Sequence, residues 1–469
     1  MKLIKQFLHS ELSAALLIIL TGLLLSYFFK IVHQITFINP DELLWMLRSN
    51  IFMERFLAGD FAGLIQSSQP GVAVMWLAGP LMYLSHFDFG TIDNLLNDLR
   101  QARIPYNVIN SNNPVYYQPY QKISFLFNLP LLSVLFIFAL CFYFSLRKLK
   151  LSKIKSLAAL SFLVSSSFYF LFFTTPTDKL LTVFMSLSLF SLLIYVRRDR
   201  FQTRPYKKYL YISAILTALA VLSKLSALFL LPFTLLVLFI YKHKNIKGII
   251  KDYFLWIIIF LITAVVFLPT IITSPETVTN LLLNNSQDRL IANSDGDFNP
   301  FLFITVALTY LSDSSLISLS PLALICLAIF FIIQIRWFHT NDIPVEPKCK
   351  SRKFGPTALA GLWNQRSFPP LKKGVKGISF ILILYFLLFF LFVTIFSKTY
   401  SFRYLAPLFP IIYLLAGIGL VNLTDLIIKR FRIPKKLAYS EMIILIFLSQ
   451  LLFIFTSRIE KIESLPDFH

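Results

Sequence analysis

The sequence contains few charged residues for its length. Of its 469 residues, 14% are charged and 57% are hydrophobic. Because about a quarter of the residues in an ordinary soluble protein are charged, this composition excludes a soluble globular chain. Glycine is also scarce, with 14 residues against 50 phenylalanines, and no Walker, Rossmann or EF-hand pattern occurs. The sequence therefore does not support an ATP-driven or dinucleotide-dependent mechanism.

Cysteine and histidine are equally sparse. Three cysteines are too few for a disulfide framework, and we interpret Cys141, Cys326 and Cys349 as structurally inert. The six histidines form no spacing with Asp or Glu that is typical of a metal site. The sequence thus gives no firm indication of a metal or of another cofactor.

Long apolar runs recur instead, at about the 20-residue length that crosses a bilayer core. They predict an all-α, polytopic membrane protein with about 11 transmembrane helices. The basic N-terminus precedes the first run without a small-residue cleavage site, so we expect a retained span. The predicted spans are residues 12–32, 123–145, 156–175, 180–196, 209–223, 225–241, 253–271, 316–335, 378–396, 404–420 and 442–455.

Basic residues predict the orientation of these spans. With a cytoplasmic N-terminus, 31 of the 44 lysines and arginines fall in the N-terminal segment and the cytoplasmic loops. This is the positive-inside distribution of a plasma-membrane protein. The net charge of +21 therefore reflects topology and contact with anionic lipid, and it does not indicate a nucleic-acid partner.

The same parity predicts a long first external loop, residues 33–122. Its apolar run at 71–84 is short and flanked or broken by prolines, so we predict an interfacial or re-entrant helix there. Residues 1–337 would form the main membrane module. The segment 338–377 is rich in Pro and Lys and reads as a cytoplasmic linker or insertion, and residues 378–469 would supply the last transmembrane helices.

Two acids open the external loop directly after the first span. Asp41 and Glu42 follow Asn39-Pro40 and begin a predicted amphipathic helix on the membrane surface. Acids in a first helical turn also stabilise the helix, so capping is the alternative role for the pair. The apolar side of this helix would consist of Leu43, Leu44, Leu47, Ile51 and Phe52, with the charged Arg48 between them in the sequence.

A few charged residues interrupt the remaining apolar sequence at predicted external boundaries. Asp178 begins the fourth span, and Lys224 stands midway through about thirty apolar residues. Arg403 precedes the tenth span, with Lys398 five residues earlier. Ionisable groups at membrane depth are costly and mark functional sites. Helix-end pairing for Asp178 and snorkelling for Lys224 are the structural alternatives.

This set of groups suits transfer of a group from a lipid phosphate. A carboxylate can act as general base on an acceptor hydroxyl, while cations stabilise the phosphate as it leaves. Hydrolysis by paired carboxylates would need a raised pKa, which the sequence does not indicate.

Several motifs resemble the GT-C superfamily, in particular the glycosyltransferase family 39 branch with protein O-mannosyltransferases and the aminoarabinose transferases of lipid A. The first is the loop PDELLWMLRSNIFMERFLAGDF followed by SSQPGVAVMWLAG. TPTDKLL, LSKLSALFLLP and FRYLAPLFPIIYLLAGIGL follow in the family's order. The resemblance covers most of the chain to about residue 420.

The resemblance implies roles for individual residues. Asp41 would be the catalytic base beside Glu42, and Asp178 a second carboxylate on the acceptor side. Lys224, Arg403 and Lys398 would contact the donor phosphate, with support from Arg48, Gln69 and Pro70 in the first loop. The chain departs from the family at Gln69, where many relatives have histidine, and at Phe402, which replaces an acid.

The expected protein is thus an inverting glycosyltransferase of a bacterial inner membrane, active on the external face. Its partners would be a polyprenyl-phosphate-linked sugar, a glycan, lipid or protein acceptor, and membrane lipid. A transporter or flippase of lipid-linked saccharides is the main alternative, although no repeated halves are visible. A polymerase or ligase of O-antigen type is a third, disfavoured by the Asp-Glu pair.

Overall fold

The structure is a computed structural model. Every regular element in the part of the chain that the structure describes is a helix. The described residues are 11–36, 40–66, 71–86, 89–100, 114–166, 176–199, 207–242, 245–280, 321–341, 375–396 and 402–463.

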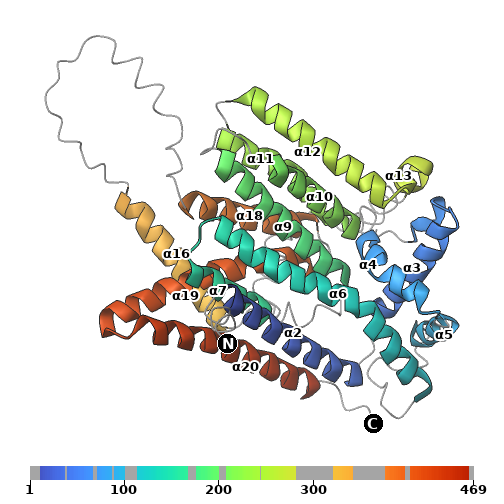
Figure 1. Ribbon diagram of the computed structural model, residues 1–469, viewed down its shortest axis with the longest axis horizontal. Coiled ribbons are helices and arrows are strands. Elements are labelled where there is room, and N and C mark those ends of the chain that lie inside the picture. Colours follow the sequence, from blue (N-terminus) through green and yellow to red (C-terminus); the bar gives the residue numbers. More distant parts are fainter. Residues whose placement is uncertain are drawn as a thin grey trace, which may run out of the picture.

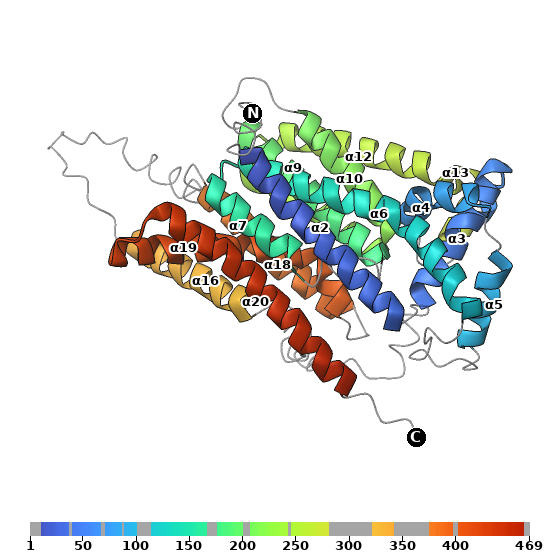
Figure 2. The same cartoon turned by 60° about the horizontal axis from the view of Figure 1, so that its bottom comes forward.

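The helices form a bundle with a cluster of short helices at one end (Figure 1). In both views α3, α4, α5 and α13 gather there, and we call it the α3 end (Figures 1 and 2). The elements are α2 (Glu11–Thr36), α3 (Pro40–Leu57), η1 (Ala62–Leu64), α4 (Val72–Leu84), α5 (Phe89–Arg100), α6 (Pro114–Lys148), α7 (Lys153–Val164), α9 (Pro176–Asp199), α10 (Lys207–Ser223), η2 (Leu225–Phe229), α11 (Leu230–Lys242), α12 (Ile246–Phe267), α13 (Thr270–Thr273), α16 (Pro321–Asn341), α18 (Val375–Phe396), η4 (Phe402–Leu408), α19 (Phe409–Phe431) and α20 (Lys435–Glu463).

Five helical stretches among the described residues are long and apolar enough to cross a membrane. Four shorter apolar helices accompany them, in α2, α4, α16 and α18. The described part of the chain is therefore all helical and includes helices that could span a membrane, as expected, while the number of 11 spans stays a prediction. The five stretches are Lys122–Lys148, Pro176–Arg197, Leu225–Lys242, Ile246–Phe267 and Leu405–Phe431.

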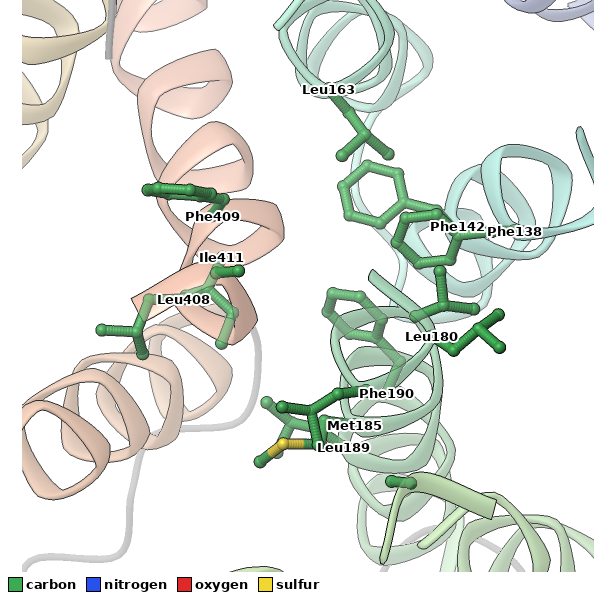
Figure 3. Close-up of a cluster of buried hydrophobic side chains, with 14 of the residues drawn as sticks. Phe138, Phe142, Leu163, Leu180, Met185, Leu189, Phe190, Leu408, Phe409 and Ile411 are labelled. Atoms are coloured by element: carbon green, nitrogen blue, oxygen red, sulfur yellow. The ribbon is translucent and has the colours of Figure 1, made fainter. Parts of the chain in front are cut away.

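Helix α9 lies at the centre of the bundle. Its span is 89% buried, against 28% for that of α12, whose remaining surface is largely apolar. Figure 3 shows Phe138 and Phe142 of α6, Leu163 of α7 and Phe190 of α9 in the hydrophobic cluster beside it. The rings of Phe142 and Phe190 meet edge to face, 5.5 Å apart. Such aromatic contacts stabilise the packing of α9 against the helices around it.

Two glycines let α19 approach its neighbours closely. A Cβ at Gly417 would lie 2.6 Å from the backbone nitrogen of Ala159 in α7. A Cβ at Gly419 would lie 2.1 Å from the carbonyl oxygen of Cys326 in α16. Small residues at helix crossings are typical of membrane bundles, where packing replaces the hydrophobic effect as the main driving force between helices.

The short apolar run of the first loop forms α4. It contains Pro80 and packs against α3, α6, α9 and α10. Its 13 residues span about 20 Å, too little to cross a hydrocarbon core of about 30 Å. The expectation of a short helix shielded by protein agrees with this packing.

Helices extend further than expected around the predicted linker 338–377. Helix α16 continues to Asn341, and α18 begins at Val375. The intervening residues 342–374 lie outside the described part of the chain.

Candidate functional site

The first turn of α3 carries the Asp-Glu pair. Pro40 begins the helix, as its fixed φ favours, and Asp41 and Glu42 follow in the first turn. The backbone of Asp41 is helical, and its side chain lies outside the described residues. The structure therefore places the backbone of Asp41 at the start of α3, and α3 packs on α4, α5 and α6.

Glu42 points from α3 onto α6 and is 4% exposed. Its carboxylate accepts hydrogen bonds from the Tyr120 hydroxyl at 3.0 Å, from Ser124 Oγ at 2.6 Å and from Asn128 Nδ2 at 2.6 Å. Three donors on a buried carboxylate offset much of the cost of removing it from water. This arrangement holds the first turn of α3 against α6.

Other helices cover the expected apolar side of α3 only in part, burying Leu43 and Phe52. Leu44, Leu47 and Ile51 remain partly exposed, whereas polar Ser49 and Asn50 are buried. Helix α3 packs on α4, α5 and α6, so its polar residues can be buried against other helices of the chain. Ser49 satisfies itself by donating to the Trp45 carbonyl at 2.7 Å.

The supporting residues of the first loop are described in part. The Arg48 guanidinium lies 5.0 Å from the centre of the Trp45 ring, a cation–π contact. The backbone carbonyl of Arg48 accepts from the Gln66 side chain at 3.1 Å. Gln69 and Pro70 lie outside the described residues.

Gly71 opens α4 in the left-handed conformation, with φ of 53°. A Cβ on this residue would lie 2.0 Å from the Trp45 ring, so the ring occupies the space that a larger residue needs. The Pro-Gly motif thus has a local reason, because only glycine meets both requirements without strain.

Two hydrogen bonds tie the first loop to the end of α12 and to the start of α13. Trp76 Nε1 donates to the Phe267 carbonyl at 2.7 Å, and Thr270 Oγ1 donates to the Phe61 carbonyl at 2.5 Å. The Trp76 ring also lies between Phe56, 4.7 Å away, and Phe267, 6.1 Å away. The short helices of the α3 end are therefore held as one unit over the bundle.

Asp178 and Lys224 form a buried ion pair. Lys224 Nζ lies 2.5 Å from Asp178 Oδ1, and the two side chains are 9% and 4% exposed, respectively. Asp178 stands in the first turn of α9, where the helix dipole stabilises a carboxylate. Lys224 is extended between α10 and η2, with φ of −162°, and this break in the helix leads its side chain to α9.

A second ammonium group lies beside this pair. Lys179 follows Asp178 in α9 and is 5% exposed. Arg403 lies in η4, which packs against α9, although its side chain is outside the described residues. Lys398 also lies outside them.

The elements that carry the candidate residues are connected through α4 and α9. Helix α4 packs on α3, α9 and α10, and η4 packs on α9. The structure therefore brings Asp178 and Lys224 into contact and places Glu42 in a separate hydrogen-bonded cluster on α6. No group of three His, Cys, Asp or Glu side chains that could hold a metal ion occurs among the described residues.

The partners of Glu42 were not predicted from the sequence. Tyr120, Ser124 and Asn128 recur every four residues, which places them on one face of α6. Polar side chains at that spacing where an apolar run begins were a detectable signal. Lys179 directly follows Asp178 in the sequence, but its burial depends on tertiary packing and could not be predicted from that position.

Comparisons of the chain with protein-family models, with curated proteins and with solved structures give no match. The resemblance to membrane glycosyltransferases therefore rests on the residues of the chain alone.

Proposed function

We propose that the protein is an inverting glycosyltransferase that moves a sugar from a polyprenyl-phosphate donor to an acceptor at the external face of a bacterial inner membrane. The observation that carries the proposal is the cluster of Asp178, Lys179 and Lys224. These three charged side chains lie buried between membrane helices, next to the unit that carries Asp41 and Glu42. Charged groups buried between such helices are costly, so their presence favours a role in binding or catalysis.

The proposed reaction needs a base and a site for the departing phosphate. Asp41 would accept the proton of the acceptor hydroxyl while the hydroxyl oxygen forms a bond to the sugar carbon. The bond between that carbon and the phosphate oxygen breaks, and the lipid phosphate leaves as an anion. Lys224, with Arg403 and Lys398, would stabilise its charge. An ammonium group has three donors, so an ion pair with Asp178 is compatible with donation to a phosphate oxygen.

A transfer assay tests this proposal. Full-length protein reconstituted in vesicles with a polyprenyl-phosphate sugar should release polyprenyl phosphate and glycosylate an acceptor. Asp41→Asn should lower turnover by at least about a hundredfold, as loss of a general base does. Asp93→Asn is a matched control, because Asp93 is exposed on α5 in the same loop. Full activity of Asp41→Asn would refute the base assignment.

A transporter or flippase of lipid-linked saccharides is the second candidate, favoured by polar groups buried along α9. Ser188 lies within hydrogen-bond distance of Ser213 at 2.9 Å and of Thr217 at 2.7 Å. Near the far end of α9, Tyr195 donates to Asp252 at 2.6 Å. A transport assay separates the two candidates. If a labelled lipid-linked saccharide crosses the vesicle membrane without acceptor, and Asp41→Asn does not change its rate, transport is favoured over transfer.

A further inference from the structure

A strongly basic turn joins α19 to α20, and we call residues 429–436 the α19–α20 turn. Five of its eight residues are basic, and the side chains of all five are exposed: Lys429, Arg430, Arg432, Lys435 and Lys436. In both views the connection between α19 and α20 lies at the end of the bundle away from α3 (Figures 1 and 2). The structure thus concentrates five positive charges on one short exposed segment.

The fold holds the two sides of this turn together. Arg432 follows the last residue of α19 in the left-handed conformation, with φ of 57°, and α20 begins at Lys435. Closer to the bundle, the Tyr439 hydroxyl of α20 donates to a carboxylate oxygen of Asp425 in α19 at 2.5 Å. This bond joins the two helices near their connected ends. The basic side chains are therefore presented by a closed helical hairpin.

The acids nearest in the sequence do not balance these charges. Between Asp425 and Glu441 the sequence contains no Asp or Glu, so residues 425–441 carry five basic and two acidic residues, a net charge of +3. Asp425 is used within the fold, since it accepts from Tyr439 and attracts the ammonium group of Lys155 in α7. Glu441 is exposed on α20, five residues after Lys436. An excess of exposed positive charge favours an anionic partner.

Exposed apolar side chains accompany the cations. Phe431 stands between two arginines in the sequence and is 69% exposed, and Leu437 in the first turn of α20 is 50% exposed. Leu426, 56% exposed, precedes Arg430 by four residues, so both lie on one face of α19. The apolar span Leu405–Phe431 ends at this turn. Cations interleaved with apolar groups at the end of a span are typical of a membrane interface, whereas an acidic protein segment would require only the charges.

We propose that the α19–α20 turn is a binding site for the headgroups of anionic phospholipids. Its guanidinium and ammonium groups would bind the phosphate oxygens, while Phe431 and Leu437 enter the region between headgroups and acyl chains. The positive-inside distribution predicts only the side of the membrane, whereas this proposal predicts saturable binding at one turn. The turn lies away from the α3 end, so the proposal does not depend on the proposed transfer activity.

Titration with a short-chain lipid tests the site. Purified full-length protein in uncharged detergent is titrated with dioctanoylphosphatidylglycerol, and thermal stabilisation gives the half-saturating concentration. Lys435→Ala/Lys436→Ala should raise that concentration by about tenfold or more. Lys247→Ala/Lys251→Ala removes the same charge from two exposed lysines of α12 and should change it less than about twofold. Equal effects of the two variants would overturn the site, as would unchanged binding by Lys435→Ala/Lys436→Ala.

Further arms separate a lipid from other anions. Lys435→Arg/Lys436→Arg should bind like the wild type, because the charges remain. Phe431→Ser should raise the half-saturating concentration by about threefold or more, since it removes an exposed apolar contact. Inorganic phosphate, a hexaglutamate peptide and dioctanoylphosphatidylcholine should each stabilise the protein far less than the anionic lipid. Equal stabilisation by phosphate or by hexaglutamate would overturn the assignment to a lipid, and the second result would assign the turn to an acidic protein segment.

Discussion

Glu42 illustrates how a carboxylate next to a candidate base can serve a positioning role. Its oxygens accept from three α6 side chains, so it holds the first turn of α3 that also contains Asp41. The resemblance to glycosyltransferases had grouped both acids as catalytic. In the described structure the carboxylate of Glu42 is directed to α6, so we interpret Glu42 as the residue that positions Asp41.

The Glu42→Gln variant separates these roles. A neutral amide accepts less strongly than a carboxylate and turns the Tyr120 hydroxyl from donor to acceptor, which should destabilise the protein by about 1–3 kcal/mol. If Glu42 positions Asp41, turnover should fall while the donor KM stays near that of the wild type. Melting temperature and steady-state kinetics measure both effects. Glu276→Gln, on an exposed glutamate, is the control. Unchanged melting with lost turnover would instead indicate direct participation of Glu42 in the reaction.

The Asp178–Lys224 pair calls for a double variant, because breaking a buried pair has its own structural cost. Lys224→Met should destabilise the fold by about 3–5 kcal/mol, since it leaves a buried carboxylate without its partner. Asp178→Asn/Lys224→Met should regain most of that stability. Melting temperatures of the two variants check this step.

Transfer kinetics of the same double variant decide whether the pair acts on the donor. If Lys224 binds the donor phosphate, the stable double variant should still show a donor KM raised by about tenfold or more. The acceptor KM should rise as well if Asp178 contacts the acceptor, because the double variant also removes that carboxylate. Restored transfer in the double variant would limit the pair to a structural role.

Sequence reasoning found these charged residues but not their contacts. Lys224 and Asp178 are separated by 46 residues, and Glu42 by 78 to 86 residues from its partners on α6. Rarity of charge in an apolar sequence identifies each residue, because its burial is costly. Which residues meet depends on how α9, α10 and α6 pack, and helical periodicity does not encode that arrangement.

Single elements were easier to predict than their neighbours. The prolines and short length of the 71–84 run correctly indicated a short helix, which the structure gives as α4 at Val72–Leu84, while its interfacial or re-entrant position stays a prediction. The location of α3 on a membrane surface stays a prediction, because the structure shows only which of its side chains other helices cover. Packing against both α4 and α6 buries Ser49 and Asn50, which an amphipathic pattern places outside.

The packing of α19 gives a test at this scale. Gly419→Leu should separate α19 from α16, because even a Cβ meets the Cys326 carbonyl at 2.1 Å. Overpacking of this kind costs about 1–3 kcal/mol or prevents folding. The yield of monodisperse protein and its melting temperature measure the effect. Leu426→Phe adds bulk to an exposed position of the same helix and should change neither.

Across the whole molecule, the net charge of +21 becomes meaningful only when it is divided between the two ends of the bundle. The α3 end carries the buried Asp178–Lys224 pair, while many exposed basic residues lie where α6 ends and where α10 and α12 begin. A positive-inside chain would place this second end in the cytoplasm and the α3 end outside. Helix α6 connects the two ends and therefore provides the most direct test of orientation.

Labelling of single cysteines at the two ends of the α6 span tests this orientation. The span Lys122–Lys148 has 27 residues, about 40 Å of helix, which is enough to cross a hydrocarbon core of about 30 Å. In a background without Cys141, Cys326 and Cys349, we expect an impermeant maleimide to label Lys122→Cys on intact spheroplasts. Lys150→Cys, in the exposed turn after α6, should react only after permeabilisation. Equal access to both positions from outside would mean that α6 does not cross the membrane. The reverse pattern would place the Asp178–Lys224 cluster on the cytoplasmic side, where a donor presented externally could not reach it.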